Sequence, residues 1–362
     1  MAENDFYSII NKTITKFSNG TIIKIAPNVF TGCTLLSEIS ANKCMVVGSS
    51  AFQQCTSLTS VVLPNLKKIN LAAFASCSSL KYVSFSECTY LGAGCFSGCV
   101  NLESVSFPKC TELAQHTFMN CSKLSKLTMS SITSVGMSCF ANCKALSSFN
   151  FNNISSIGSY AFASCNAITS IDLENYKASI ISQYTFTSCI GLQTVNLGAR
   201  ITSLGYGCFS GCTNLTTINL DTVKYIGDYN FQRCSNLKSI YAPACSSMGG
   251  YVFSYCSALS IINFPILSSV PYGGFGGSNG VHTIYIDTIK IISNYAFSGM
   301  SSLQSLYLRS VSAVPTINNY TFWGCPLSST GSTGKVYVPT SLYSSFIKAA
   351  YWSYISTRIV SI

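Results

Sequence analysis

The sequence predicts an α/β solenoid of about fourteen repeats of 22–25 residues. The skeleton Phe-x-x-Cys-x-x-(Leu/Ile)-x-x-(Val/Ile)-x-(Leu/Phe) recurs along the chain, and its anchor phenylalanines are mostly 22 residues apart. Within each repeat, the apolar residues are first three positions apart and then alternate. The anchors are Phe30, Phe52, Phe74, Phe96, Phe118, Phe140, Phe162, Phe186, Phe209, Phe231, Phe253, Phe275, Phe297 and Phe322.

Each repeat is expected to contain one short helix or 3₁₀ turn and one short parallel strand. Phe162, Cys165 and Ile168 are spaced at i, i+3 and i+6, which places them on one face of a helical turn. The alternating residues 171–173 that follow are typical of a strand. Because no single repeat buries these apolar residues alone, neighbouring copies are expected to stack.

Three domains are predicted: an N-terminal cap (residues 1–29), the solenoid (30–325) and a C-terminal cap (326–362). Caps are expected because the end repeats of a solenoid otherwise expose a sheet edge. In the N-terminal cap, residues 18–20 read Ser-Asn-Gly between two apolar stretches and predict a β-hairpin. The first residues carry acids and no continuous apolar core, so a signal peptide is not expected.

The C-terminal cap is expected to contain a strand, a helix and a second strand. The strands are expected at 335–339 and 358–362, and the helix at 341–351. Thr340 or Ser341 is expected to cap this helix, because a hydroxyl can accept a hydrogen bond from the first turn.

The composition limits the classes of partner. Charged residues make up 9% of the chain, against about 25% in an average globular domain. The formal charge is +10, but the basic residues are scattered and form no block, so nucleic-acid binding is not expected. No apolar run approaches the roughly 20 residues that span a bilayer, so membrane insertion is not expected.

The nineteen cysteines occupy repeat columns. Twelve lie three residues after an anchor, three lie directly before one, and four lie fourteen residues after one. In the last of these columns other repeats carry apolar residues, such as Leu66 and Ile154. We therefore expect free, buried thiols that pack as small apolar side chains, rather than disulfides or zinc ligands.

No motif predicts catalysis, and the chain is not expected to be an enzyme. The two histidines, His116 and His282, are far apart in repeat number, and the eleven acidic residues are spread over the array. No phosphate loop, zinc spacing or activated nucleophile is present, so no metal or cofactor is expected.

The outward residues of the strands are the candidate binding surface. Tyrosine gathers in the C-terminal quarter of this surface, and tyrosine is enriched in interface cores because it offers rigid area with a polar tip. Alternatively, these residues are strand-favouring side chains that only stack in a ladder. The candidate partner-binding residues are Tyr241, Asn263, Tyr285, Tyr307, Asn219, Asn196 and Asp172.

The strand half of the repeat, Leu-x-x-Val-x-Leu/Phe-x-x-Cys, matches the leucine-rich repeat pattern. The whole unit, as in Ala51–Leu58, resembles the BspA-like (Treponema pallidum-type) branch of bacterial leucine-rich repeats over roughly residues 25–325. This resemblance implies a rod-shaped surface adhesin that contacts host matrix proteins or other cells. Similar arrays without a leader resemble proteins encoded in prophage tail regions.

We therefore expect a non-enzymatic binding or adhesion module that presents a curved sheet lined by Ser, Thr, Asn and Tyr. Its expected partner is a protein or glycan ligand on host matrix, a cell surface or a receptor. The resemblance implies an extracellular or cell-surface location. The alternative is a phage tail-associated structural or receptor-binding protein, which would be virion-associated.

Overall fold

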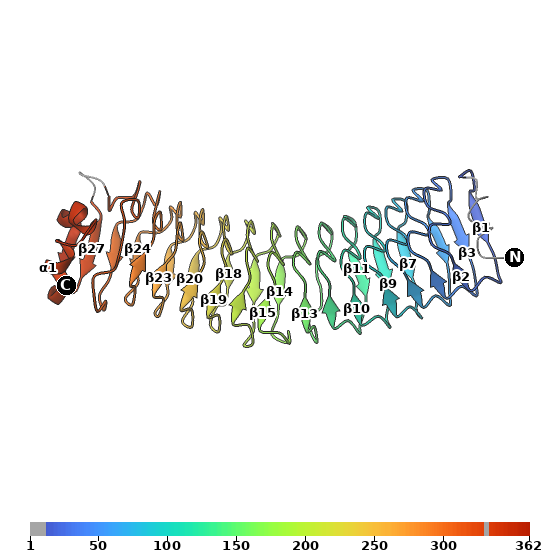
Figure 1. The fold of residues 1–362 in the computed structure, drawn as a ribbon, viewed down its shortest axis with the longest axis horizontal. Coiled ribbons are helices and arrows are strands. Elements are labelled where there is room, and N and C mark those ends of the chain that lie inside the picture. Colours follow the sequence, from blue (N-terminus) through green and yellow to red (C-terminus); the bar gives the residue numbers. More distant parts are fainter. Residues whose placement is uncertain (1–11, 329–332) are drawn as a thin grey trace. The chain divides into compact units, whose positions relative to one another are not determined.

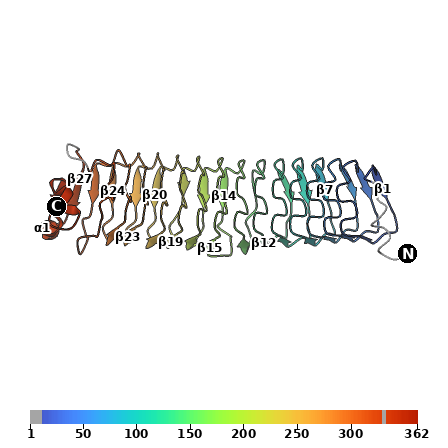
Figure 2. The ribbon, with the colours of Figure 1, turned by 45° about the horizontal axis from the view of Figure 1, so that its top comes forward.

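The computed structural model describes residues 12–328 and 333–362, which form two units of stacked parallel strands (Figure 1). One unit ends at Ile168, and the second begins at Thr169. A typical repeat contains a first strand, a second strand and then a turn that carries the anchor phenylalanine. We call the first strands row A and the second strands row B. Figure 2 shows row A above row B in each unit.

Neighbouring strands of the first unit pair in parallel, for example Val83 with Val105. Its row A strands are β1 (Lys16–Ser18), β3 (Glu38–Ser40), β5 (Ser60–Val62), β7 (Tyr82–Ser84), β9 (Ser104–Ser106) and β11 (Lys126–Thr128). Its row B strands are β2 (Lys24–Ile25), β4 (Val46–Val47), β6 (Lys68–Ile69), β8 (Tyr90–Leu91), β10 (Glu112–Leu113), β12 (Ser134–Val135) and β13 (Ser156–Ile157). Residues 148–150, where the repeat pattern predicts another row A strand, form none.

The second unit has the same kind of arrangement, with parallel pairs such as Ile240 with Ile262. Its row A strands are β14 (Ser170–Asp172), β16 (Thr194–Asn196), β18 (Thr217–Ile218), β20 (Ser239–Tyr241), β22 (Ile261–Asn263), β24 (Thr283–Tyr285), β26 (Ser305–Tyr307), β27 (Lys335–Val338) and β28 (Ile359–Ser361). Its row B strands are β15 (Ile180–Ile181), β17 (Ser203–Leu204), β19 (Tyr225–Ile226), β21 (Ser247–Met248), β23 (Ser269–Val270) and β25 (Ile291–Ile292).

The prediction of one helix or 3₁₀ turn in each repeat is wrong, and a repeat contains two short strands instead of one. At nearly every anchor, the residues two positions before and two positions after it have positive φ, as do Ala72 (52°) and Ser76 (61°) on either side of Phe74. Such left-handed residues interrupt a right-handed helix. The apolar spacing of three residues is common to a helix and to successive tight turns, so it does not distinguish them.

The anchor turns form a hydrogen-bond ladder between repeats. The N–H groups of Ala72, Phe74 and Ser76 donate to carbonyls of the next repeat over 2.7–2.9 Å. The N–H groups of Ala75 and Cys77 donate to carbonyls three positions back, over 3.0 and 3.2 Å. The turn therefore satisfies its backbone donors without the bonds of an α-helix.

The anchor phenylalanines stack along the inside of each unit. The ring centroids of Phe30 and Phe52 are 5.1 Å apart, with an angle of 6° between the ring planes. In the second unit, the corresponding values for Phe231 and Phe253 are 5.3 Å and 7°. These rings are buried. The stacking of parallel strands about 4.8 Å apart accounts for this spacing, and it gives each unit a continuous aromatic column.

All nineteen cysteines are buried, as the sequence predicts. Their role is wider than apolar packing. The thiol of Cys55 donates a hydrogen bond to the carbonyl of Phe30 over 3.1 Å, and that of Cys77 donates to Phe52 over 3.1 Å. The Phe30 carbonyl also accepts the N–H of Cys33. The cysteine column thus joins most anchor turns to the preceding one.

The predicted N-terminal hairpin is wrong. Strand β1 pairs in parallel with β3 and strand β2 with β4, so the two segments that flank Asn19 belong to different rows. The side-chain oxygen of Asn19 accepts the N–H groups of Thr21 and Ile22 and thereby shapes the turn. Residues 1–11, which carry the signal-peptide prediction, lie outside the described residues. The domain boundaries stay predictions.

The C-terminal segment adds β27 and β28 to row A, with short helices between them: η1 (Thr340–Leu342), α1 (Tyr343–Phe346) and η2 (Trp352–Arg358). The prediction of Thr340 or Ser341 as helix cap is wrong, because neither η1 nor α1 has a side-chain cap bond. The Thr340 hydroxyl instead bonds to the Ser361 hydroxyl over 2.8 Å and to the Ile362 carbonyl over 3.1 Å. This contact joins the first helix to the last strand.

Candidate binding surface

Four of the seven candidate residues form one column across row A of the second unit. Tyr241 lies beside Asn263, Asn263 beside Tyr285, and Tyr285 beside Tyr307. Successive residues of a strand point to opposite faces, and the neighbouring residues at 240, 262, 284 and 306 are buried. The four side chains therefore lie on the outer face, where Tyr241 is 54% and Tyr285 is 42% exposed.

The column continues onto β27 through Tyr337, which pairs with Tyr307. The ring centroids of Tyr285 and Tyr307 are 4.8 Å apart, and those of Tyr307 and Tyr337 are 4.4 Å apart, with angles of 18° and 9°. We call Tyr285, Tyr307 and Tyr337 the tyrosine stack. The sequence interpretation missed Tyr337 because it assigned residues 335–339 to the cap. The alternation of Lys335–Val338 was the available signal.

A cation lies beside the tyrosine stack. The guanidinium carbon of Arg309 is 4.8 Å from the centre of the Tyr285 ring, which is a cation–π contact. Arg309 Nη2 is 2.6 Å from Asp287 Oδ2, and this ion pair raises the pKa of Arg309 above its ordinary value. The sequence interpretation missed both residues. Their separation of 22 residues, which is one repeat, is the signal that pairs them.

The other three candidate residues lie on the strands β14, β16 and β18, or directly after them. The side-chain nitrogen of Asn196 donates to Asp172 Oδ1 over 2.9 Å, so the structure brings these two together. The side-chain oxygen of Asn219 accepts the backbone N–H of Leu197 over 2.6 Å. Strand β18 and strand β20 are not paired, so these residues and the tyrosine stack belong to separate sheets. The side-chain oxygen of Asn219 is thus engaged by the backbone of the neighbouring repeat.

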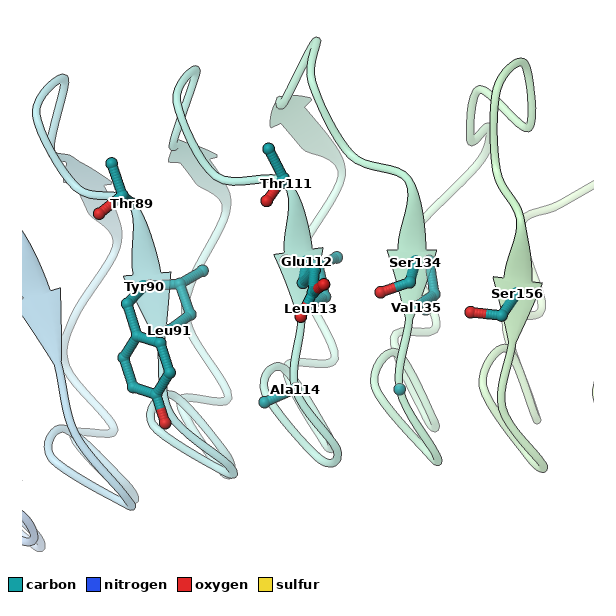
Figure 3. A pocket seen from close by; sticks show the side chains of 11 residues that line it. Thr89, Tyr90, Leu91, Thr111, Glu112, Leu113, Ala114, Ser134, Val135 and Ser156 are labelled. Carbon is teal, nitrogen blue, oxygen red and sulfur yellow. The ribbon is translucent and has the colours of Figure 1, made fainter.

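A shallow groove of about 210 Å³ lies over row B of the first unit, across β8, β10, β12 and β13. Figure 3 shows Tyr90 at one end of this groove and Ser156 at the other, with Glu112 and Ser134 between them. The ammonium nitrogen of Lys68 is 4.5 Å from the centre of the Tyr90 ring. None of the seven candidate residues lines this groove, and its one carboxylate, Glu112, forms no acid–base pair within it.

The described residues contain no group of three or more His, Cys, Asp and Glu side chains that could hold a metal ion. His116 lies in an anchor turn with a φ of 59°, and the Nδ1 atom of His282 is 3.0 Å from the carbonyl oxygen of Gly280. Within the same described ranges, no helix is long and apolar enough to cross a bilayer. The arrangement supports recognition by rigid aromatic and polar side chains.

The family described as "BspA type Leucine rich repeat region (6 copies)" matches residues 1–125, 111–238, 155–281 and 224–345. No curated protein is similar enough in sequence to match. A leucine-rich repeat protein from Bacteroides ovatus ATCC 8483 is 19% identical, with a TM-score of 0.67 over 94% of this chain and 88% of that chain. This likeness shows the shared fold.

Two further solved structures have lower TM-scores. A leucine rich cell surface protein from Faecalibacterium prausnitzii A2-165 is 20% identical, with a TM-score of 0.41 over 95% of this chain and 82% of that one. The pneumococcal vaccine antigen PcpA is 15% identical, with a TM-score of 0.48 over 96% of this chain and 87% of that one.

Proposed function

This chain belongs to the BspA-type leucine-rich repeat family, and from that premise we propose that it is a non-enzymatic binding module. Row A of the second unit holds the partner, which is a protein or a glycan. The residues of the candidate site have different roles in this proposal. The tyrosine stack, Tyr241 and Asn263 form the contact surface, and Asp172 and Asn196 supply polar groups on the separate sheet.

The tyrosine stack carries the proposal. Its rings pack against one another, so they lose little freedom when a partner binds. Tyrosine and arginine dominate the energetics of protein interfaces, and Arg309 is held beside the stack by Asp287. A polar tip on each ring also suits the hydroxyl groups of a glycan. Small hydroxyl side chains elsewhere on row A supply fewer such contacts.

An extracellular or cell-surface location is part of the proposal, and family membership supports it. The cysteines are compatible with an oxidising environment, because burial raises the pKa of thiols such as Cys55 and Cys99 to about 12. A thiol that stays protonated and buried is a poor nucleophile and reacts slowly with oxidants. Surface labelling of intact cells with an antibody to the chain tests the location.

A binding screen tests the function. The chain is presented to arrays of glycans and to immobilised matrix proteins, and any hit is measured again with the tyrosine stack disrupted. A partner that binds wild type and loses affinity for the variant supports the proposal. The absence of any partner in either array would favour the phage tail-associated structural alternative.

A further inference from the structure

A second, longer row of tyrosines lies on the anchor turns of the second unit. Neighbouring ring centroids in this row are 4.9–5.3 Å apart. From the sequence alone, the column that holds most of these tyrosines indicates ordinary surface positions of the repeat. We call the row the turn ladder, and its members are Tyr184, Tyr206, Tyr229, Tyr251, Tyr272, Tyr295 and Tyr320.

The backbone of the turn ladder is unfavourable for tyrosine. Tyr184, Tyr229, Tyr251 and Tyr295 have φ between 55° and 59°, a left-handed conformation that a bulky side chain rarely adopts. Glycine adopts it without strain. The same position has positive φ in the first unit, where it holds residues such as Asn28, Ser50 and Ala72, so the fold imposes the conformation and the tyrosines are accommodated in it.

In two repeats, the residue that contributes the ring to the turn ladder is not the one with positive φ. Gly207 and Gly273 occupy the left-handed position there, and the ring comes from the preceding residue, Tyr206 or Tyr272. A Cβ atom on Gly207 would lie 2.6 Å from the Tyr184 ring, so glycine makes room for the neighbouring tyrosine. Every repeat from Tyr184 to Tyr320 therefore contributes one ring to the ladder.

Phenol groups of the ladder also touch one another. Burial and a hydrogen bond with Tyr184 raise the pKa of Tyr206, and burial and a hydrogen bond with Tyr272 raise that of Tyr251. The ring centroids of these two pairs are 4.9 Å and 5.3 Å apart. Tyr272 is 43% exposed and Tyr320 is 44% exposed, so the ladder is accessible from solvent.

We propose that the turn ladder is a site of oxidative modification, in which tyrosines of successive repeats are joined as dityrosine. The oxidant is hydrogen peroxide acting through a haem peroxidase. Each of two phenols loses one electron and its hydroxyl proton and becomes a phenoxyl radical. The radicals form one carbon–carbon bond between their ortho carbons, and the hydrogens of those carbons move to the oxygens. The peroxide takes up the two electrons and two protons and becomes two waters.

The contact between rings directs the reaction. A radical formed on an exposed member, such as Tyr272, has a second phenol in contact on each side. Coupling within the chain therefore competes well with coupling between chains. The modification links repeats covalently and lies outside row A, so it is independent of the proposed function.

The test treats the purified chain with a haem peroxidase and hydrogen peroxide. All samples carry Tyr307→Phe, which removes the central phenol of the tyrosine stack on row A. Dityrosine fluorescence on the monomer is expected, with cross-linked peptides that join Tyr184 to Tyr206 and Tyr251 to Tyr272. Adding Tyr206→Phe, Tyr251→Phe and Tyr295→Phe is expected to remove most of this signal. Phenylalanine keeps the ring but forms no phenoxyl radical, and no two neighbours of the ladder then both carry a phenol.

A matched control adds Tyr225→Phe and Tyr354→Phe instead. These tyrosines are 43% and 75% exposed and lie outside the turn ladder, so their loss is expected to leave the signal unchanged. The proposal is overturned if no dityrosine forms, if the control loses as much signal as the ladder variant, or if cross-linked dimers account for most of the product.

Discussion

The hydroxyl of Ser278 donates a hydrogen bond to the carbonyl of Phe253 over 2.7 Å. Ser278 occupies the column that holds cysteine in twelve of the fourteen repeats and Met300 in one. The cysteines make the same bond, as Cys256 does to Phe231 over 3.1 Å. The column therefore selects a small buried donor. This bond also holds the glycine-rich turn at 271–277 in the hydrogen-bond ladder between repeats. The N–H group of Gly277 still donates to a carbonyl of the next repeat.

The exchange of cysteine for serine tests this donor role. Cys99→Ala removes the bond to the Phe74 carbonyl and leaves a small cavity, so we expect a loss of about 1–2 kcal/mol in unfolding free energy. Cys99→Ser is expected to lose less, because the hydroxyl can still donate. Urea denaturation measures both. If the Cys99→Ala variant had the same unfolding free energy as wild type, the hydrogen bond of the thiol would contribute nothing to stability.

The aromatic column predicts a large effect at a central anchor. Phe231 is buried between Phe209 and Phe253, with centroid distances of 5.7 and 5.3 Å. Phe231→Ala is expected to cost roughly 3–5 kcal/mol, because it removes both contacts and leaves a cavity. The exposed Tyr225 in the same repeat is the control, and Tyr225→Ala is expected to change stability by less than about 0.5 kcal/mol. Equal effects in a denaturation series would contradict the packed column.

The thiols predict a loss of stability at alkaline pH. Burial raises the pKa of Cys55, Cys99 and Cys256 to about 12, whereas thiols of an unfolded chain ionise near about 8.5. Their contribution is complete below the unfolded pKa and is lost as pH rises toward the folded pKa, because only the unfolded chain ionises in this window.

The measurement is the urea midpoint at several pH values between about 7 and 10, with a reductant present. The midpoint is expected to fall above about pH 8.5. Replacing the three cysteines by serine is expected to make this fall smaller but not to abolish it, because serine does not titrate there and the other buried thiols remain. A midpoint independent of pH in wild type would show that the thiols are already accessible.

Much of the architecture could be predicted from the sequence because the repeat imposes it. The columns of Phe, Cys and Leu identify the buried face, and equal spacing aligns Tyr241, Asn263 and Tyr285 on successive strands. The turn could not be assigned, because Ala72 and Ser76 give no local sign of their positive φ. The inter-repeat bonds force that conformation, and a single repeat does not contain them.

The candidate surface, too, could be predicted only in part from the sequence. The alternating strand residues predicted the outward column, but Tyr337 lies 30 residues after Tyr307 rather than 22, which obscures the register that pairs them. The sequence interpretation treated Tyr285 and Tyr307 alike as exposed. In the structure, Tyr307 is only partly exposed because rings pack on both of its faces.

The tyrosine stack predicts where binding energy is concentrated. We expect Tyr285→Ala with Tyr307→Ala to weaken partner binding at least tenfold, or about 1.4 kcal/mol. The double variant removes two of the three stacked rings and the surface on which Arg309 rests. Because Tyr307 packs between two rings, we also expect a loss of about 1 kcal/mol in stability. Affinity is measured by titration calorimetry at a temperature where circular dichroism shows both proteins folded.

Tyr225→Ala is the matched control, because Tyr225 is 43% exposed against 42% for Tyr285 but lies on row B. This variant is expected to bind as wild type does. Weaker binding by the control alone would move the site to row B. Unchanged affinity in the double variant would remove the tyrosine stack from the interface and leave Asp172 and Asn196 as the next residues to replace. A loss in the double variant alone would fix the partner on the stack, because both variants remove exposed tyrosine area and only one disrupts the stacked column.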